Sequence, residues 1–317
     1  MIWVTWRQHR AQILVTAGFL ALLGLLLLGS AIEANWHVTE HAPGCPGPVE
    51  QCLEVVAGLF DRYDAVYSVF GWMPLVAPAL IGAFWGAPLL GREYERGTHR
   101  LAWTQGVPVR RWLVIKLSVL GGAVVAGGLL LSLMVSLWRP VFKGGSDSTF
   151  GNIGVFNMVG VEPAAWWLYA FALGAAAGSL FRRTLPAMAL VVAGVAVTMF
   201  TLFQLSDHYA EPVRTELSGT MVLGDRDARM VRAAWVEPSG REVDEPVAGG
   251  CPRQVPESEE TAEAWHDCLF GKGHRYAVYY HPPSRFWRFQ WTEAGILTLA
   301  SVALGGLAVR RTHRRPG

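Results

Sequence analysis

Long apolar runs, separated by polar loops, dominate the chain. The six most prominent occupy residues 13–31, 69–90, 113–137, 165–180, 185–205 and 294–309. A hydrocarbon core of about 30 Å is crossed by about 20 apolar residues in helical form, so each run predicts a membrane-spanning segment. We expect helices rather than strands, because a backbone in lipid must satisfy its own hydrogen bonds.

Ionisable side chains are almost absent from these six runs. The exception is Lys116, one turn from the start of the third run, where its long side chain can reach back to the membrane surface. Carriers driven by protons or sodium usually bury carboxylates at mid-membrane, and the predicted spans contain none. We therefore do not expect a self-sufficient ion-coupled carrier.

Small residues and prolines predict how the helices pack. Gly82 and Gly86 are four residues apart, as are Gly174 and Gly178, a spacing that lets helix backbones approach closely. We expect these faces to pack within the chain, although packing between subunits is the alternative. The second run is interrupted by prolines, which should bend it where neighbouring helices satisfy the freed carbonyls: Pro74, Pro78 and Pro88.

The composition agrees with a membrane protein, since 52% of the 317 residues are hydrophobic and only 16% are charged. The predicted fold class is all-α and polytopic, with about six transmembrane helices. The first run could instead be a cleaved signal peptide, because Arg7 and Arg10 precede it and small residues follow. Its length exceeds the usual signal core, and cleavage would leave five spans in the same orientation.

The basic residues predict the orientation. About half of the 27 Lys and Arg fall before the first run, in the second and fourth loops and after the last run. Under the positive-inside rule both termini are then cytoplasmic. Arg is far commoner than Lys, and with abundant Ala, Gly and Val this suggests a gene rich in G and C, so we expect a bacterial plasma membrane.

All four cysteines, Cys45, Cys52, Cys251 and Cys268, fall in loops that this orientation places outside. An oxidising exterior would permit the bridges Cys45–Cys52 and Cys251–Cys268, each closing a short loop. Four cysteines allow three pairings, and unpaired thiols are the alternative.

The loops divide the chain into regions of different character. Residues 1–205 contain five spans and an inner loop at 91–112, residues 206–290 form the largest outer segment, and 291–317 contain the last span with a basic tail. We expect 206–290 to be a small extracytoplasmic lobe of mixed structure. Its runs 221–223 and 276–280 predict strands, and 237–240 predicts a turn. Residues 53–68 have the spacing of an amphipathic helix.

No catalytic machinery is evident in the chain. It has no Gly-x-x-x-x-Gly-Lys-[Ser/Thr] loop for ATP and no His-Glu-x-x-His metalloprotease pattern, so we expect no catalytic or metal site and no cofactor. A lipid-modifying enzyme would need polar constellations near several spans. Asp207 and His208 at one span end do not suffice.

The inner loop between the second and third runs is highly charged but contains interleaved apolar residues. Its residues 91–116 can form a short helix with one face toward lipid and the other toward a cytoplasmic partner. Glu93 and Glu95 are the only acidic residues on the inner side, and fixing the orientation does not require them. They favour a specific contact over a loop that only sets topology.

Several stretches of the chain resemble the permease subunits of ABC-2 type transporters, in the branch with a short Trp-Arg-Gln-rich N-terminus. Six spans with cytoplasmic ends are also that family's plan. The outer segment 206–290 is larger than in its simplest members. The resemblance rests on the order of Trp3-Val-Thr-Trp-Arg-Gln-His-Arg10, Pro78-Ala-Leu-Ile-Gly82, Arg92-Glu-Tyr-Glu-Arg-Gly-Thr98, Pro108-Val-Arg-Arg-Trp112 and Arg285-Phe-Trp.

The resemblance implies a separate ATP-hydrolysing subunit, which carries ATP and Mg²⁺ and docks on the inner loop, and two permease chains forming the path as a homodimer or heterodimer. It implies export rather than uptake, and no nucleic-acid partner. Arg110 and Arg111 would steady the helix that follows the loop. The residues that would couple nucleotide binding to helix movement are Glu93, Glu95, Arg96, Gly97, Thr98 and Arg100.

A membrane sensor or accessory protein is the alternative function. In that case residues 206–290 would bind an external ligand and the inner loop would pass on a signal, with no ATPase required.

Overall fold

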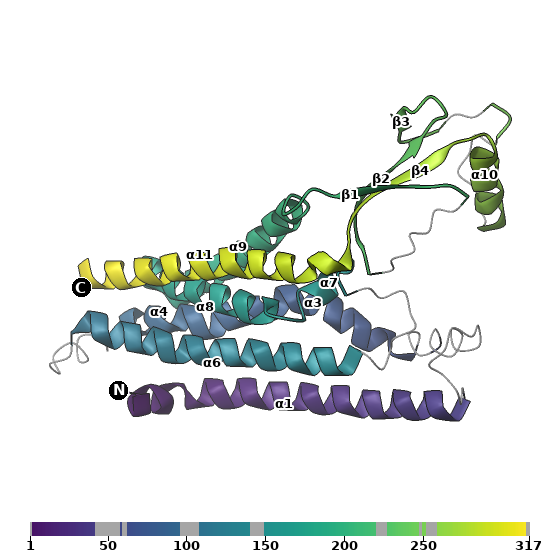
Figure 1. The fold of residues 1–317 in the computed structure, drawn as a ribbon. Coiled ribbons are helices and arrows are strands. Elements are labelled where there is room, and N and C mark those ends of the chain that lie inside the picture. The colour runs from purple at the N-terminus through teal and green to yellow at the C-terminus, as the bar shows by residue number, and fades with distance from the viewer. Residues whose placement is uncertain are drawn as a thin grey trace. The chain divides into compact units, whose positions relative to one another are not determined.

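The structure is a computed structural model that describes residues 2–41, 58, 62–95, 108–139, 149–219, 227–246, 249–251 and 259–314. The chain forms two compact units (Figure 1). We call them the helical unit, which comprises Met1–Gly145, Ile153–Gln204 and Arg288–Gly317, and the β-lobe, which comprises Ser146–Asn152 and Leu205–Trp287.

Six helical segments in the described part of the chain are long and apolar enough to cross a membrane, and they contain all six predicted runs. The helices extend beyond the apolar runs, most of all α1, because helical hydrogen bonding continues into the polar flanks. The segments are α1 (Ile2–His41), the composite of α3 (Asp64–Ile81), η1 (Gly82–Gly86) and α4 (Ala87–Glu95), α6 (Val109–Trp138), α8 (Glu162–Phe181), α9 (Thr184–Ser206) and α11 (Phe286–Arg314).

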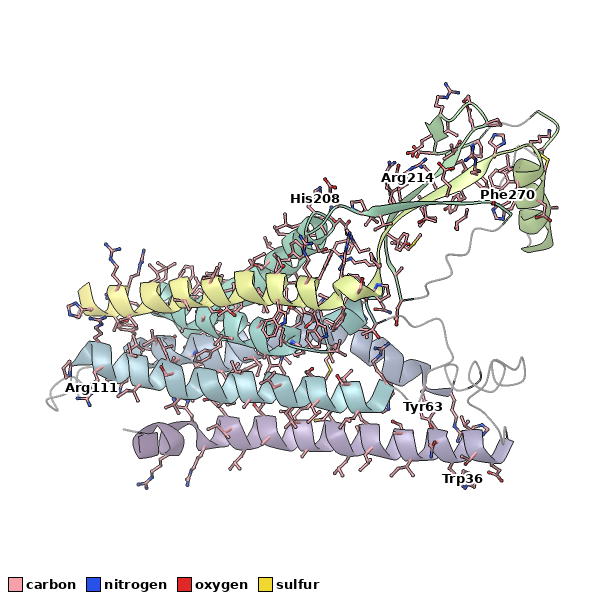
Figure 2. All side chains as sticks on the ribbon, viewed as in Figure 1. Trp36, Tyr63, Arg111, His208, Arg214 and Phe270 are labelled. Atoms are coloured by element: carbon pink, nitrogen blue, oxygen red, sulfur yellow. A yellow bond between two sulfur atoms is a disulfide. The ribbon has the colours of Figure 1, made fainter. Side chains whose placement is uncertain are left out.

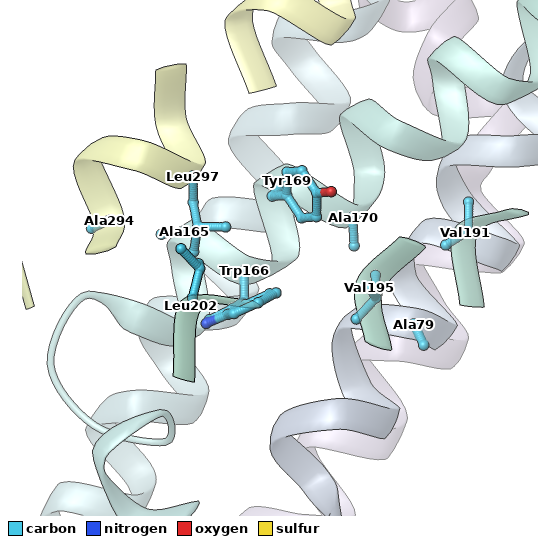
Figure 3. Packing of buried hydrophobic residues seen from close by; sticks show 10 residues of the cluster. All are labelled: Ala79, Ala165, Trp166, Tyr169, Ala170, Val191, Val195, Leu202, Ala294 and Leu297. Atoms are coloured by element: carbon cyan, nitrogen blue, oxygen red, sulfur yellow. The ribbon is translucent and has the colours of Figure 1, made fainter. Parts of the chain in front are cut away.

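Helix α8 lies at the centre of the helical unit. In the most apolar 18-residue stretch of each helix, 78% of the residues of α8 are buried, but only 11% of those of α1. Helix α8 is therefore surrounded by other parts of the chain, whereas α1 is peripheral. Trp166 and Tyr169 of α8 pack against α9 and α11 (Figure 3). Their polar atoms are satisfied, since Trp166 Nε1 donates to Asn157 Oδ1 over 3.1 Å and Tyr169 Oη lies 2.7 Å from Thr198 Oγ1. The cluster contains Ala79, Ala165, Trp166, Tyr169, Ala170, Val191, Val195, Leu202, Ala294 and Leu297.

The glycine pairs allow α8 to touch the second span backbone to backbone. A Cβ added at Gly174 would lie 2.3 Å from the carbonyl oxygen of Gly82, and one at Gly86 would lie 2.4 Å from that of Phe171. At Gly178 it would lie 2.6 Å from the oxygen of Ala87. Both predicted small-residue faces therefore pack against each other within the chain.

The second span changes its helical geometry where prolines interrupt it. Pro74 and Pro78 lie inside α3, and residues Gly82–Gly86 form a π-helix. In an α-helix the carbonyl of Phe84 would accept from residue 88, but Pro88 has no N–H. Gln12 Nε2 of α1 instead donates to that carbonyl over 2.8 Å. A neighbouring helix thus satisfies the freed carbonyl, as the prolines predicted.

The described part of the β-lobe is an antiparallel four-stranded sheet with one α-helix. The strand order is β1-β4-β2-β3, and the helix is α10 (Glu259–Gly271). Trp235 of β2 anchors the core through ring contacts with Trp265 and Phe270 of α10 and with Tyr276 of β4. The strands are β1 (Val213–Leu217), β2 (Arg229–Val236), β3 (Glu242–Val243) and β4 (Arg275–His281).

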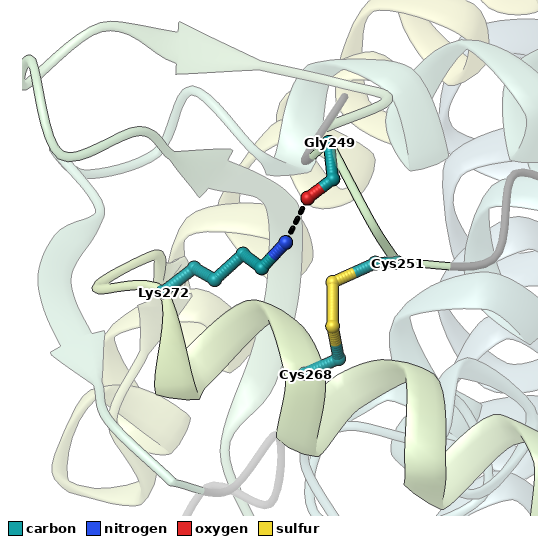
Figure 4. Close-up of a disulfide and its surroundings, with 4 residues drawn as sticks. All are labelled: Gly249, Cys251, Cys268 and Lys272. Carbon is teal, nitrogen blue, oxygen red and sulfur yellow. Dashed lines mark hydrogen bonds between the residues drawn. A yellow bond between two sulfur atoms is a disulfide. The ribbon is translucent and has the colours of Figure 1, made fainter.

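The predicted strand at 276–280 and the predicted turn at 237–240 are both present. The turn is closed by the N–H of Gly240, which donates to the carbonyl of Glu237 over 2.8 Å, and Gly240 adopts φ +87°. A disulfide joins Cys251 to Cys268, and Lys272 donates to the carbonyl of Gly249 beside it (Figure 4). This bridge is one of the pairings that the sequence suggested. In the chain-entropy account a loop of this size gains about 3 kcal/mol.

Several predicted features lie outside the described residues. They are the cysteines Cys45 and Cys52, the inner-loop residues Arg96, Gly97, Thr98 and Arg100, the strand at 221–223 and half of the helix at 53–68.

Candidate functional site at the basic end of the helical unit

Basic residues gather at one end of the helical unit, where α4 ends, α6 begins, α8 gives way to α9 and α11 ends. Figure 2 labels Arg111 there, at the start of α6. We call this region the basic end. It comprises Arg92, Arg110, Arg111, Lys116, Arg182, Arg183, Arg310 and Arg311.

Glu93 and Lys116 form an ion pair that joins the second span to the third. Lys116 Nζ lies 2.5 Å from Glu93 Oε1, and the two side chains are only 3% and 19% exposed. The Lys116 ammonium also lies 5.0 Å from the centroid of the Trp112 ring. Lys116 therefore reaches a carboxylate that lies beyond the end of the second apolar run, and this carboxylate compensates its charge.

Glu95 joins the same helix end to the fifth span. Its Oε1 accepts the backbone N–H of Thr184 over 2.8 Å, and its Oε2 accepts the Thr184 hydroxyl over 2.9 Å. Thr184 is the first residue of α9, so Glu95 satisfies a donor that the helix itself leaves unpaired. A carboxylate at this position also complements the positive end of the helix dipole.

Tyr94, between the two glutamates, contacts the connection between the fourth and fifth spans. Arg182 ends α8 in the left-handed conformation, with φ 54°, and its guanidinium carbon lies 5.3 Å from the centroid of the Tyr94 ring. Three consecutive residues of α4 therefore contact α6, the α8–α9 connection and α9. We call Glu93, Tyr94 and Glu95 the 93–95 segment.

An apolar layer lies directly beneath these polar contacts. Leu90, Leu113 and Ala308 are almost fully buried together, and Tyr94 and Trp112 pack against them. This layer brings α11 into the same cluster as α4 and α6. Beside it, a cavity of about 310 Å³ is lined by Tyr94, Ser179, Leu180, Arg182, Leu307, Arg310 and Arg311.

The structure brings together some of the predicted site residues but not all of them. Glu93 and Glu95 have partners inside the chain, and Arg110 and Arg111 are exposed at the first turn of α6. Sequence reasoning did not find Tyr94, Arg182 or Thr184. Thr184 did carry a local signal, because threonine often caps a helix and this one stands between two arginines and an apolar run. No local pattern, however, predicts its contact with Glu95, which lies 89 positions earlier in the chain.

The opposite end of the helical unit contains buried polar groups that the sequence placed outside the spans. Gln290 Oε1 accepts the N–H of Val161 over 2.9 Å, and its Nε2 donates to the carbonyls of Phe156 and Val159. Glu162, in the first turn of α8, is fully buried, and Glu293 of α11 is 5% exposed. The helices α8 and α11 begin earlier than the predicted apolar runs, so these two carboxylates are buried near the starts of the helices, outside the runs from which the sequence expects carboxylates to be absent.

Among the described residues, no three His, Cys, Asp or Glu side chains gather closely enough to hold a metal ion. The carboxylates of the basic end are engaged by a lysine and by a helix start. The contacts of these carboxylates therefore connect α4 to α6 and α9.

Six apolar helices in the described part of the chain, one of them the buried central helix α8, define a polytopic membrane protein. The chain belongs to the ABC-2 membrane transporter related family, whose model matches residues 17–205. The match covers more than half of the chain, from within the first span almost to the end of the fifth, and includes Glu93, Glu95, Lys116 and Thr184. No curated protein and no solved structure matches the chain.

Proposed function

We propose that this chain is the permease subunit of an ATP-driven transporter and that a separate ATPase subunit binds at its basic end. Family membership supports a transport role. The observation that carries the rest is the 93–95 segment, which links one helix end to three other spans immediately before the charged loop 96–107.

The proposed topology places both termini and the basic end in the cytoplasm. The concentration of arginine at the basic end supports this orientation through the positive-inside rule. The Cys251–Cys268 disulfide supports an extracytoplasmic β-lobe, because such bonds persist in oxidising compartments. A multi-pass protein of a bacterial plasma membrane would have its basic end in the cytoplasm and its disulfide in the oxidising compartment outside.

In the proposed mechanism the loop 96–107 receives movement from the ATPase subunit and the 93–95 segment distributes it. Movement of the 93–95 segment is transmitted to α6 through the contact of Glu93 with Lys116, and to α9 through the contact of Glu95 with Thr184. Arg96, Gly97, Thr98 and Arg100 form the contact with the ATPase subunit. Nucleotide drives transport because it favours one arrangement of the helices, and the substrate has a different affinity for each arrangement.

A second permease chain, identical or related, completes the translocation path, and the direction is export. The peripheral helix α1 offers a large apolar surface, since only 11% of its most apolar window is buried within the chain. ATP and Mg²⁺ bind the partner subunit, whereas this chain contributes the path and the linkage.

The decisive experiment is capture of an ATPase by the tagged chain from mild detergent. The test variant is Arg96→Glu with Arg100→Glu, which reverses the charge of the loop and leaves Glu93, Glu95, Lys116 and Thr184 unchanged in the sequence. The matched control is Arg226→Glu with Arg253→Glu, the same two charge reversals within the segment 206–290. We expect the wild type and the control to capture a P-loop ATPase with ATP turnover, and the test variant to lose it.

If the wild type captures no ATPase under conditions that preserve other membrane complexes, the permease proposal is wrong. Binding of an external ligand by the β-lobe then becomes the function to test. Equal capture by the wild type and the loop variant would reject the docking site at residues 96–100.

A further inference from the structure

A deep apolar groove separates α1 from the second span. Its volume is about 880 Å³, within the range of about 300 to 1,000 Å³ that is usual for ligand sites. Val15 and Phe19 form the wall on α1, and Val76, Leu80 and Phe84 form the wall on α3 and η1. Trp167 of the central helix α8 also lines the groove.

The walls of the groove belong to two membrane-spanning segments, and their side chains are uncovered by the rest of the chain. Val15 is 73% exposed, Phe19 55% and Phe84 55%. At this depth of a bilayer the surroundings are hydrocarbon, so an aqueous solute is excluded. The occupant has to present apolar surface along most of its length.

Polar side chains occur at one end of the groove, and they bond to one another. Gln12 Nε2 donates to the carbonyl of Phe84, and the Nδ1 of His9 lies 2.6 Å from Gln12 Oε1. Trp85 Nε1 donates to Thr16 Oγ1 over 3.1 Å. These bonds hold the two walls together at the end nearest the basic end, and they leave the remainder of the groove for apolar contacts.

The length of the groove matches one leaflet of a bilayer. On α1 it extends from Ala11 to Phe19, about 12 Å at a rise of 1.5 Å per residue, and on the second span from Trp72 to Trp85, about 20 Å. Half of a hydrocarbon core measures about 15 Å. Arg7 and Arg10 precede the groove residues on α1, and basic residues next to a membrane span attract anionic headgroups.

We propose that this groove binds an acyl chain of a membrane lipid from the leaflet at the basic end. The lipid seals α1 against the second span beside the π-helix, where backbone geometry is irregular. Such binding requires the chain to span a membrane but does not depend on an ATPase partner. Failure of the lipid test would therefore leave the proposed transport function unaffected, and failure of ATPase capture would leave the lipid site unaffected.

Native mass spectrometry of the full-length chain in mild detergent tests this site, with the co-purifying phospholipid as the probe. Ala77 lines the groove, so Ala77→Phe fills it, whereas Leu80→Asn makes its wall polar. The control is Val197→Phe on α9, which enlarges a 65% exposed side chain away from the groove. We expect about one lipid per chain in the wild type and control, and a loss of about tenfold or more in both groove variants.

Two results would overturn the proposal: lipid retained equally by the wild type and both groove variants, or lost equally in the Val197→Phe control. Absence of retained lipid from the wild type would do the same. Elution as a single monodisperse species shows that a variant is folded. If Ala77→Phe aggregates, Leu80→Asn supplies the comparison.

Discussion

Lys116 shows how a single residue can be placed correctly in the sequence and still have an unexpected environment. It is the one cation inside a predicted apolar run, and a lysine near a span end normally reaches toward water. Here the side chain is 3% exposed and pairs with Glu93. The carboxylate comes from a helix end that lies 23 residues earlier, so the pair forms only when α4 packs against α6.

Removing one member of this pair should destabilise the helical unit more than removing both. In Lys116→Met a carboxylate that is 19% exposed loses its partner, and we expect a loss of about 3 kcal/mol in the free energy of unfolding. The double variant Lys116→Met with Glu93→Gln should lose less. Unfolding by denaturant in detergent measures both effects.

The control for this pair is Arg111→Met, which removes an exposed cation five residues earlier on the same helix. We expect its effect to be within about 0.5 kcal/mol of zero. A loss equal to that of Lys116→Met would show that the ion pair is not the cause.

At the scale of elements, the second span depends on α1 for its irregular segment. The π-helix and Pro88 leave the Phe84 carbonyl without its usual α-helical donor, and Gln12 supplies one. A carbonyl left unsatisfied away from water would cost about 1–3 kcal/mol, and Phe84 lies in a segment apolar enough to cross a membrane. Helix α1 is thus attached to the bundle by a polar bond as well as by packing.

A double-mutant cycle at positions 12 and 88 tests this dependence. Gln12→Leu should destabilise the wild type by about 1–2 kcal/mol, because the Phe84 carbonyl loses its donor. In a Pro88→Ala background the same change should cost less, since an alanine at that position restores a backbone N–H. Equal costs in the two backgrounds would show that Gln12 and Pro88 are not coupled.

The sheet of the β-lobe contains a row of charges that spans its four strands. Tyr279 of β4 is paired in register with Arg214 of β1 and Arg232 of β2. Glu242 of β3 accepts from the Tyr279 hydroxyl over 2.6 Å and from both arginines over 3.1 Å. The hydrogen bond from Tyr279, aided by those from the arginines, lowers the pKa of Glu242. Hydrogen bonds from Arg214 and Arg275 likewise lower the pKa of Glu216.

These shifts predict that the β-lobe loses stability on acidification. Because each pKa is lower in the folded lobe than in the unfolded chain, the carboxylates stabilise the fold fully above the ordinary glutamate pKa of about 4.3. The stabilisation is lost as the pH falls through the folded pKa. The protection factors of the β2 and β4 amides in the full chain, which correct for the slower intrinsic exchange in acid, should therefore fall below about pH 4.

Glu216→Gln combined with Glu242→Gln should flatten this pH dependence. The exposed Glu245→Gln, just after β3, serves as the matched neutralisation. An unchanged pH profile in the double variant would contradict the assignment.

At the scale of the whole molecule, the proposed topology predicts which segments can be labelled from outside the cell. In a chain with all four cysteines replaced by serine, Ser239→Cys in the turn of the β-lobe should react with an impermeant maleimide in intact cells. Thr104→Cys in the loop 96–107 should react only after permeabilisation. The reverse pattern would invert the orientation and remove the basis for ATPase docking at the basic end.

The sequence alone was sufficient for the number and place of the spans, their helical nature and the family resemblance. Apolar runs of membrane length predict spanning helices, and small residues spaced four apart predict close helix packing. Both are local signals that do not depend on which other segments of the chain lie nearby. The Cys251–Cys268 bridge and the strand at 276–280 were likewise visible, because they depend on short stretches of chain.

Only the tertiary structure decided which groups meet across long separations in the chain. Glu93 and Glu95 looked like residues reserved for a partner, yet they engage Lys116 and Thr184 within the chain. Glu162 and Glu293 looked like loop residues until α8 and α11 were seen to bury them. These outcomes depend on how helices pack, and desolvation of a charge is compensated only by the groups that packing brings within reach.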